Sequence, residues 1–378
     1  GGSEIGDRRG SRGGGGGDAR DGQPPLPWTK DGYSQPATPD GATPSPIVNR
    51  RAGPILITAP HGLRCFRGGK AHGDRRRIHH REKFSTEIAL KLSAAIGRQM
   101  GFPCSFIVWN MKTAKRADNA NLDPNYLLDS QFDRSPWHLA LVDWKNACRA
   151  AGSPCMHVDF HGKHDPKPKK GSRVKKFTLD LGIDPLTDCA EDREETDATA
   201  LQWTEAEAEA LKTAAFDELS MAMSEVTLGS QHSPAPVVVD ADPYLCGLWG
   251  HGCECTLSHQ AVREGVPAFQ LETPYTLRRA MASDDGAIVE RMAAAIVSLY
   301  QNVVTQVEAG KGPITDYTEM PMPERMGPQK ESAGGAGGAG GAGGAEEDAA
   351  LVQADLVAIE AMLGDIRVLD ARDSDKQI

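Results

Sequence analysis

The sequence predicts an α/β domain with a mixed, mostly parallel sheet flanked by helices. Short apolar runs typical of strands alternate with longer segments in which apolar residues recur at helical spacing. Alternation of this kind indicates a layered sheet whose strands are joined by crossover helices. With 378 residues, 39% of them hydrophobic, the chain is long enough to bury one substantial core.

The first part of the predicted domain alternates strand, helix and strand. Pro54–Thr58 is a compact apolar run that predicts a strand, and the Pro-His-Gly turn after it leaves His61 at the strand's carboxyl end. The segment 63–81 is rich in arginine and glycine and predicts a loop. From Glu82 to Met100 apolar residues recur every four positions, which predicts a helix that Glu82 opens. Pro103–Trp109 predicts the next strand.

The central stretch of the chain is the run Pro154–Val158, which predicts a strand arriving at a turn. A helix is expected before it, over Trp137–Ala151, from its composition. Asp159 and His161 follow the strand two residues apart, so on an extended chain their side chains lie on one face. This arrangement suits a metal-bound imidazole with a carboxylate in reach to orient it.

The rest of the domain continues the alternation of strands and helices. Thr204 is of a residue type that caps helices, and a strong helical pattern follows it. The further predicted strands are Phe177–Leu181, Pro236–Asp240 and Pro267–Glu272, and the further predicted helices are Thr204–Val226, Leu257–Gly265 and Ala287–Val307.

The chain divides into four parts by composition. We expect residues 1–52, rich in glycine, proline and arginine, to be disordered, and residues 53–310 to form the domain. Residues 311–345 are a Pro/Gly/Ala-rich linker. Within 346–378, apolar residues over 352–366 follow a 4-3-4-3 spacing that predicts a short amphipathic helix. So short a helix needs a surface to dock on, either its own domain or a partner protein, and the sequence leaves both open.

Composition excludes several classes of function. A formal net charge of −10 argues against general nucleic-acid binding, and no run of 18 apolar residues predicts a membrane span. The eight cysteines include no CxxC pair, which favours reduced thiols in an intracellular, cytoplasmic protein, with an organelle left open. Cys253-Glu-Cys255 could chelate a second metal with His251 and His259, although one intervening residue is a cramped spacing for zinc.

Histidines and carboxylates near predicted strand ends indicate a metal site. His61 and His161 each end a predicted strand, and Glu82 opens the helix after the first loop. Two neutral imidazoles and one carboxylate with an open position form a usual catalytic zinc set. Glu272, on the last strand, could take a proton from a metal-bound water and pass it to a leaving nitrogen.

Two loops beside these residues are strongly basic. The segments 62–81 and 162–176 each contain seven Lys or Arg and one acidic residue, and each follows a candidate ligand. If the loops meet at one rim, they would attract an anionic substrate. His79 and His80 in the first loop are rival ligands near Glu82, but their arginine-rich setting disfavours a dication.

Five motifs, in this order, resemble the N-formylglutamate amidohydrolase family, which consists of metallohydrolases related to zinc carboxypeptidases. The resemblance covers roughly residues 54 to 300. The motifs are Ala-Pro-His61-Gly, Glu82 followed by Ser85-Thr86, Arg116-Ala-Asp118-Asn119-Ala-Asn121, Asp159-Phe-His161-Gly and Gly265-Val-Pro-Ala-Phe-Gln270-Leu-Glu272.

The resemblance implies a phosphorylase/hydrolase-like α/β domain with one zinc ion per chain. Its ligands would be His61, Glu82 and His161, and Glu272 would be the general acid/base. Asp159 and Gln270 would support these residues from behind.

Further positions are expected to handle the substrate. Arg116 or Asn121, with Arg278 after the last strand, would hold a substrate carboxylate or polarise its carbonyl, and Arg116 would then steady the oxyanion. His251 lies in a Gly-rich loop at the same end and could bind substrate or serve a structural turn.

The sequence as a whole therefore predicts a zinc-dependent hydrolase that cleaves the amide C–N bond of an anionic N-acyl amino acid or acidic peptide. The alternative is a catalytically inactive metallohydrolase fold that serves as a binding or assembly module through its C-terminal helix.

Overall fold

The structure is a computed structural model. It describes residues 46–48, 53–67, 77–102, 104–109, 123–167, 174, 176–186, 203–230, 233–240, 254–283, 286–309, 353, 356–357 and 359–363.

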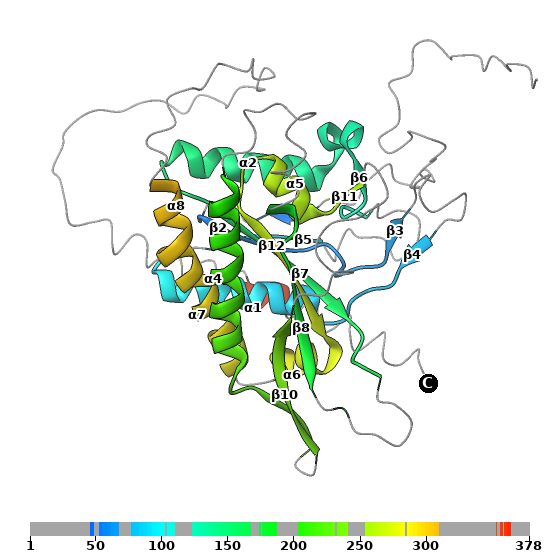
Figure 1. Cartoon of the computed structure of the whole chain (residues 1–378). Coiled ribbons are helices and arrows are strands. Elements are labelled where there is room, and N and C mark those ends of the chain that lie inside the picture. Colours follow the sequence, from blue (N-terminus) through cyan, green and yellow to red (C-terminus); the bar gives the residue numbers. More distant parts are fainter. Residues whose placement is uncertain are drawn as a thin grey trace, which may run out of the picture.

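An eight-stranded sheet forms the centre of the domain (Figure 1). Four neighbouring pairs are parallel, β5–β2, β2–β7, β7–β12 and β8–β10, and the other three pairs are antiparallel. This confirms the predicted mixed, mostly parallel sheet. In spatial order the strands are β1 (Pro46–Val48), β5 (Ser105–Trp109), β2 (Ile55–Ala59), β7 (Met156–Lys163), β12 (Ala268–Pro274), β8 (Phe177–Gly182), β10 (Ser233–Asp240) and β9 (Thr227–Ser230).

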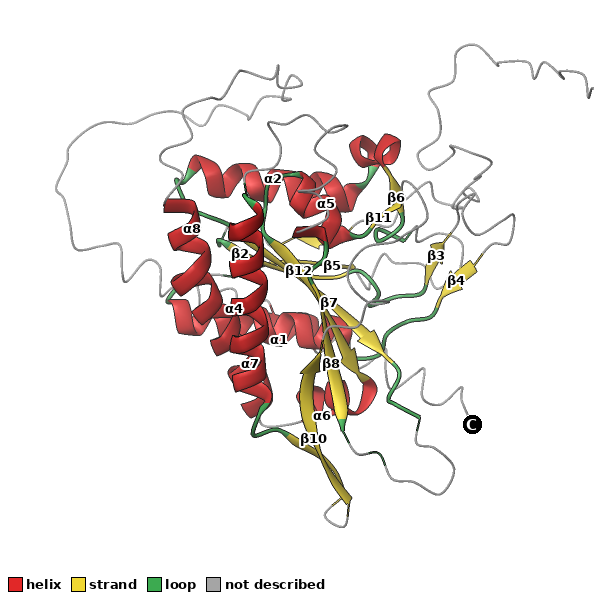
Figure 2. Cartoon of the chain, viewed as in Figure 1, coloured by secondary structure: helices red, strands yellow, loops and turns green. Residues whose placement is uncertain are grey.

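Helices cover both faces of this sheet (Figure 2). On one side α1 (Ser85–Met100) and α4 (Glu205–Met223) both pack against α7 (Ala287–Leu299). On the other side lie α2 (Pro136–Ala150) and α5 (Leu257–Arg263). All residues of β2, β5 and β12 are buried, as expected for strands covered on both faces.

The remaining elements are short. α6 (Tyr275–Ser283) directly follows β12, and a π-helical turn (Tyr300–Val304) joins α7 to α8 (Thr305–Ala309). A 3₁₀ turn (Asp129–Arg134) precedes α2. Two small antiparallel pairs lie beside the main sheet, β3 (Cys65–Arg67) with β4 (Arg77–His79) and β6 (Leu127–Leu128) with β11 (Glu254–Cys255).

Three sequence predictions about local structure were wrong. The segment 63–81 contains the β3–β4 pair, so it is not entirely a loop. Asp159 and His161 lie inside β7, not in a turn, because β12 pairs with β7 as far as Lys163. Glu82 precedes α1 because Phe84, the N-cap residue, has a left-handed backbone (φ 71°) that cannot continue into a helix.

The long C-terminal helical segment, Ala287–Val307, belongs to the domain. By length and composition it is the one helix among the described residues that could cross a membrane, and half of its most apolar window is buried inside the structure. Its first part packs against α1 and α4. Its apolar character is therefore explained by core packing.

The predicted amphipathic helix near the C-terminus is described in part, and its apolar face meets the domain. Ile359 and Leu363 are buried and belong to the main hydrophobic core, whereas Val357 is 62% exposed. The stripe therefore docks on the chain's own domain in this structure. The role of a protein partner for residues 352–366 stays a prediction, as do the boundaries of the four predicted parts.

Candidate metal centre

Three neighbouring strands bring the predicted site residues to one edge of the sheet. β2 and β7 are parallel, so their carboxyl ends meet at the same edge; His61 lies just after β2 and His161 lies near the end of β7. On β12, Glu272 is the direct neighbour of His161. Side chains of directly paired residues point to the same face of a sheet. The predicted ligands and the predicted base therefore converge.

Each of the two histidines is followed by a glycine that the packing requires. A Cβ atom at Gly62 would lie 1.8 Å from Thr86 Oγ1, at the start of α1. A Cβ atom at Gly162 would lie 2.2 Å from the guanidinium carbon of Arg278. Both distances are impossible for a real side chain, so the two His-Gly sequences allow other elements to pass directly beside the site.

The imidazoles and one carboxylate form the centre of the cluster. His61 Nδ1 lies 2.9 Å from Glu82 Oε1 and 2.9 Å from His161 Nδ1. His161 Nδ1 lies 3.6 Å from Glu82 Oε2, and the backbone N–H of Gly162 donates to that oxygen at 2.7 Å. All three side chains are buried. His61, Glu82 and His161 are thus brought together as predicted.

The far nitrogen of each histidine faces a buried carboxylate. His61 Nε2 lies 2.9 and 3.1 Å from the two carboxylate oxygens of Asp123, and His161 Nε2 lies 2.9 Å from Asp159 Oδ2. Burial would raise the pKa of Asp159, but the positive charge of His161 and hydrogen bonds to its carboxylate lower that pKa below its ordinary value. An ionised carboxylate only accepts hydrogen bonds. The Nε2 protons therefore point at the carboxylates.

This arrangement leaves an electron-rich centre that fits a metal ion. With the Nε2 atoms turned toward carboxylates, both imidazoles present their Nδ1 atoms to one another and to Glu82. Burial would lower the pKa of His161, but Asp159 and Glu82 raise it well above its ordinary value, so the centre favours positive charge, which a metal ion would supply. Two imidazole nitrogens and a carboxylate, each held from behind by further groups, are the donor set of zinc sites.

The pKa values in the cluster show that its carboxylates favour a positive charge between them. Burial would lower the pKa of His61, but the carboxylates of Asp123 and Glu82 outweigh it and raise that pKa. Burial would raise the pKa of Glu82, but His61 and His161 hold it well below its usual value. Glu82 is therefore ionised, as a metal ligand must be.

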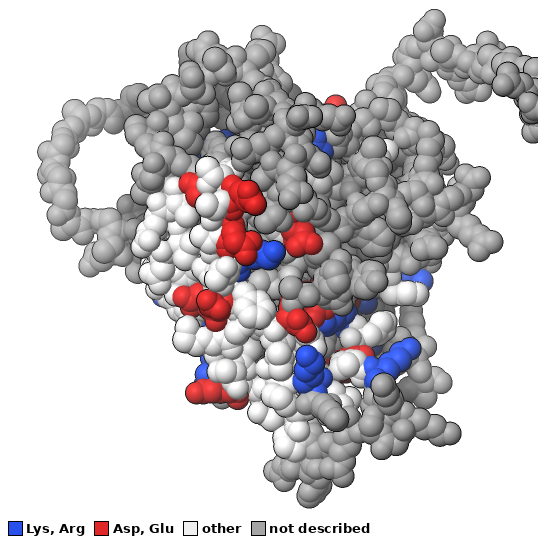
Figure 3. Space-filling model, viewed as in Figure 1, with Lys and Arg blue, Asp and Glu red and all other residues white. Residues whose placement is uncertain are grey.

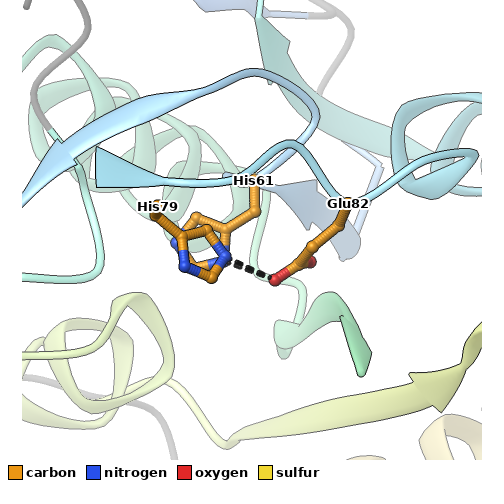
Figure 4. Close-up of side chains that lie close together, drawn as sticks. All are labelled: His61, His79 and Glu82. Atoms are coloured by element: carbon orange, nitrogen blue, oxygen red, sulfur yellow. Dashed lines mark hydrogen bonds and ion pairs between the residues drawn. The ribbon is translucent and has the colours of Figure 1, made fainter. Parts of the chain in front are cut away.

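His79, one of the two rival ligands, also joins the cluster (Figure 4). Its Nε2 lies 2.8 Å from Glu82 Oε1, and its ring centroid lies 3.8 Å from that of His61. His61, His79 and Glu82 each offer a ligand atom within 4.8 Å of the others. The end of β4 thus supplies either a further ligand or a hydrogen-bond donor to Glu82. The other rival, His80, is exposed.

Glu272 is buried beside the cluster, and Gln270 donates from Nε2 to its Oε1 at 2.6 Å. Burial raises the pKa of Glu272, and the charge of Glu82 raises it further against the opposing effect of His161. A raised pKa moves a carboxyl group toward the range in which a general acid/base works. Gln270, predicted to support the site from behind, is the residue that contacts Glu272.

Arg278, predicted to bind substrate, holds the backbone around the site together. Its guanidinium donates to the carbonyl oxygens of Thr273, Lys83 and Lys163 at 3.1, 2.7 and 3.1 Å. These contacts join the end of β12 to the segment before α1 and to the end of β7. Such a structural role was not predicted, and contact of Arg278 with substrate stays a prediction.

The other predicted substrate residues, Arg116, Asn121 and His251, lie outside the described residues. So do Cys253 and residues 68–76, 168–173 and 175 of the two basic segments. The five described cysteines are buried and form no disulfide with one another: Cys65, Cys104, Cys148, Cys155 and Cys255. Figure 3 shows acidic side chains along α4 and Lys and Arg side chains toward the ends of β7 and β8.

Sequence reasoning missed two residues of the site, Asp123 and Asn125. Asp123 is fully buried and anchors His61, and Asn125 Nδ2 lies 2.8 Å from His161 Nε2. The side-chain oxygen Oδ1 of Asn125 accepts from the backbone N–H of Leu257, which fixes the orientation of the side-chain amide at the start of α5. The signal available was an Asp-Pro-Asn sequence directly after a polar segment, which predicts a turn and not a metal support.

No family model matches the chain, and no curated relative was found. Among solved structures the chain is similar to a candidate carboxypeptidase from Burkholderia mallei, at 14% identity and a TM-score of 0.32, covering 67% of this chain and 57% of that one. It is also similar to succinylglutamate desuccinylase from Chromobacterium violaceum, at 13% identity and a TM-score of 0.29, covering 67% of this chain and 60% of that one.

A third similar structure is the N-acetylmuramyl-L-alanine amidase Ami1 from Mycobacterium smegmatis, at 12% identity and a TM-score of 0.30, covering 68% of this chain and all of that one. The chain spans less than two thirds of the carboxypeptidase and of the desuccinylase. TM-scores of this size carry no argument about the site, which stands on its own geometry. The resemblance to the N-formylglutamate amidohydrolase family stays a prediction.

Proposed function

We propose that the protein is a zinc-dependent hydrolase of amide C–N bonds. The observation that carries the proposal is the convergence of the Nδ1 atoms of His61 and His161 with the Glu82 carboxylate, next to the buried carboxyl group of Glu272. A metallohydrolase needs a metal centre and, next to it, a carboxyl group that can accept and donate a proton.

In the proposed reaction His61, Glu82 and His161 hold the metal, with His79 as a further ligand or as a donor to Glu82. Zinc, when bound, polarises the amide carbonyl and lowers the pKa of a water toward about 7. Glu272 takes the proton of the attacking water on a carboxylate oxygen and returns it to the leaving nitrogen. The Gln270 amide, which donates to Glu272 Oε1, keeps that carboxyl group in place.

The proposed substrate class is an anionic N-acyl amino acid or an acidic peptide. Its support is the excess of Lys and Arg in the two segments that follow His61 and His161. The charge of such groups at the rim favours the approach of a carboxylate.

Glu272→Gln separates catalysis from metal binding. The variant keeps the shape of the side chain but cannot accept a proton, so we expect zinc to be retained and hydrolysis to fall about 100-fold or more. Zinc content and hydrolysis of a panel of N-acyl amino acids and acidic peptides would be measured by mass spectrometry. Glu290→Gln, which alters an exposed carboxylate on α7, serves as the matched control and should behave as wild type.

Two outcomes would contradict the proposal in different ways. Hydrolysis that is unchanged in Glu272→Gln would remove Glu272 from its role. Wild-type protein that binds zinc but cleaves no member of the panel would favour the alternative, a binding module that retains the fold.

A further inference from the structure

A line of hydrogen-bonding groups leads from His161 into the core of the sheet. Thr58 of β2 is the direct neighbour of Asp159 of β7. Its hydroxyl lies 2.6 Å from Asp159 Oδ1 and 2.8 Å from His157 Nε2. Asp159 Oδ2 in turn faces His161 Nε2. All four side chains are at most 1% exposed, so bulk water does not compete for these contacts.

The protons along this line have one consistent direction. His157 Nδ1 is buried and has no hydrogen-bond partner among the described residues. A buried N–H without an acceptor is less favourable than a buried acceptor without a donor, so the ring proton of His157 belongs on Nε2, facing Thr58. The Thr58 hydroxyl accepts that proton and has only one of its own, which it donates to Asp159.

Asp159 matters because it is one of two groups that hold the His161 ring. Asp159 Oδ2 lies 2.9 Å from His161 Nε2, and the Asn125 amide nitrogen lies 2.8 Å from the same atom. The bond from Leu257 N to Asn125 Oδ1 keeps that amide in place. The position of the Asp159 carboxylate therefore decides how the His161 ring is turned toward Glu82 and His61.

We propose that Thr58 and His157 are positioning residues that hold the Asp159 carboxylate behind His161 and thereby keep His161 Nδ1 directed at the metal site. The consequence for zinc rests on the proposed function; the direction of the hydrogen bonds does not. The hydroxyl of Thr58 anchors Asp159 Oδ1, and His157 fixes which way that hydroxyl points. Two residues of the sheet core thus orient a ligand through Asp159.

Zinc affinity of three variants tests the proposal. Thr58→Val keeps the side-chain shape and removes the hydroxyl, so we expect zinc to bind about tenfold more weakly or worse in a competition with a chromophoric chelator. Thr58→Ser restores the donor and should stay close to wild type. Thr273→Val is the matched control, because Thr273 is also fully buried in the sheet but its hydroxyl has no partner among the described residues. It should leave zinc affinity unchanged.

Nitrogen NMR of His157 supplies a readout that needs neither zinc nor substrate. Burial lowers the pKa of His157 to about 4, so the ring is neutral at pH 7 and its tautomer is observable. We expect the proton on Nε2. A proton on Nδ1 would overturn the proposed direction in the wild-type protein itself, whatever the variants do.

The outcomes separate this inference from the proposed function. Equal zinc affinity in wild type, Thr58→Val and Thr58→Ser would overturn the positioning role and leave the hydrolase proposal standing. A wild-type protein that binds no zinc would remove the proposed function and the consequence drawn here for zinc. The tautomer of His157 would still decide the direction of the hydrogen bonds.

Discussion

At the scale of single residues, the site depends on what stands behind and beside its ligands. Sequence reasoning identified His61, Glu82 and His161, because histidines after apolar strands and a following carboxylate are visible in the order of residue types. It missed Asp123 and assigned Arg278 only to the substrate. The reason is physical: the partner of a buried side chain depends on which distant segments meet, which local patterns do not encode.

Gly162→Ala tests the close contact between the Arg278 guanidinium and the backbone of Gly162. The new methyl group would overlap the guanidinium, so we expect the free energy of unfolding to fall by about 1–3 kcal/mol. Urea unfolding measures this change. In an Arg278→Ala background the same substitution should destabilise less, because the clashing group is gone. An equal effect in both backgrounds would contradict the contact.

At the scale of elements, the long strands and helices were predicted and the short ones were not. The helix after Thr204 is confirmed, with the Thr204 hydroxyl accepting from the backbone of Glu207. β3, β4 and β9 have three or four residues each, too few for a periodic pattern to appear in sequence. β7 was predicted too short, since its last residues are polar and are held extended by pairing with β12.

Contact between α2 and α5 predicts a dependence of stability on pH. Burial would raise the pKa of Glu264, but hydrogen bonds and charge from His138 and Lys145 lower it to about 2. A carboxyl group with a lowered pKa stabilises the fold above its unfolded pKa, 4.5, and this contribution disappears as the pH falls toward 2. We therefore expect Glu264→Gln to lower the unfolding free energy by on the order of 2 kcal/mol at pH 6.

Urea unfolding of wild type and Glu264→Gln at pH 6 and pH 3 measures the effect. The difference between the two proteins should shrink at pH 3, because Glu264 of the unfolded wild-type chain gains a proton below its pKa of 4.5 while the folded protein stays largely ionised. A difference that is constant with pH would contradict the lowered pKa of Glu264 in the folded protein.

At the scale of the whole molecule, the alternation of strand and helix patterns predicted an α/β domain with a mixed, mostly parallel sheet. The structure confirms this prediction. The sheet order could not be predicted, because it is decided by long-range packing of helices of similar character. The same holds for the C-terminal helix: its stripe was visible in the sequence, but the surface that covers it was not. In the structure that surface is the domain's own core.

Because this helix docks on the domain, a substitution on its buried face should lower the stability of the whole domain. Ile359 is 4% exposed and packs into the main core, so Ile359→Ala should lower the unfolding free energy of the domain by about 2–4 kcal/mol. Val357→Ala, at a position that is 62% exposed, should change it little. Thermal and urea unfolding of the full chain compare them. Two variants of equal, wild-type stability would mean that the helix does not stabilise the domain.

The central claim is that His61, Glu82 and His161 hold one metal ion. Its most direct test is the zinc content of wild type, His61→Ala and His161→Ala after incubation with zinc and removal of the excess, measured by elemental mass spectrometry. The account predicts about one zinc per wild-type chain and its loss from both variants. Wild-type protein without zinc, or variants that keep it, would contradict the account.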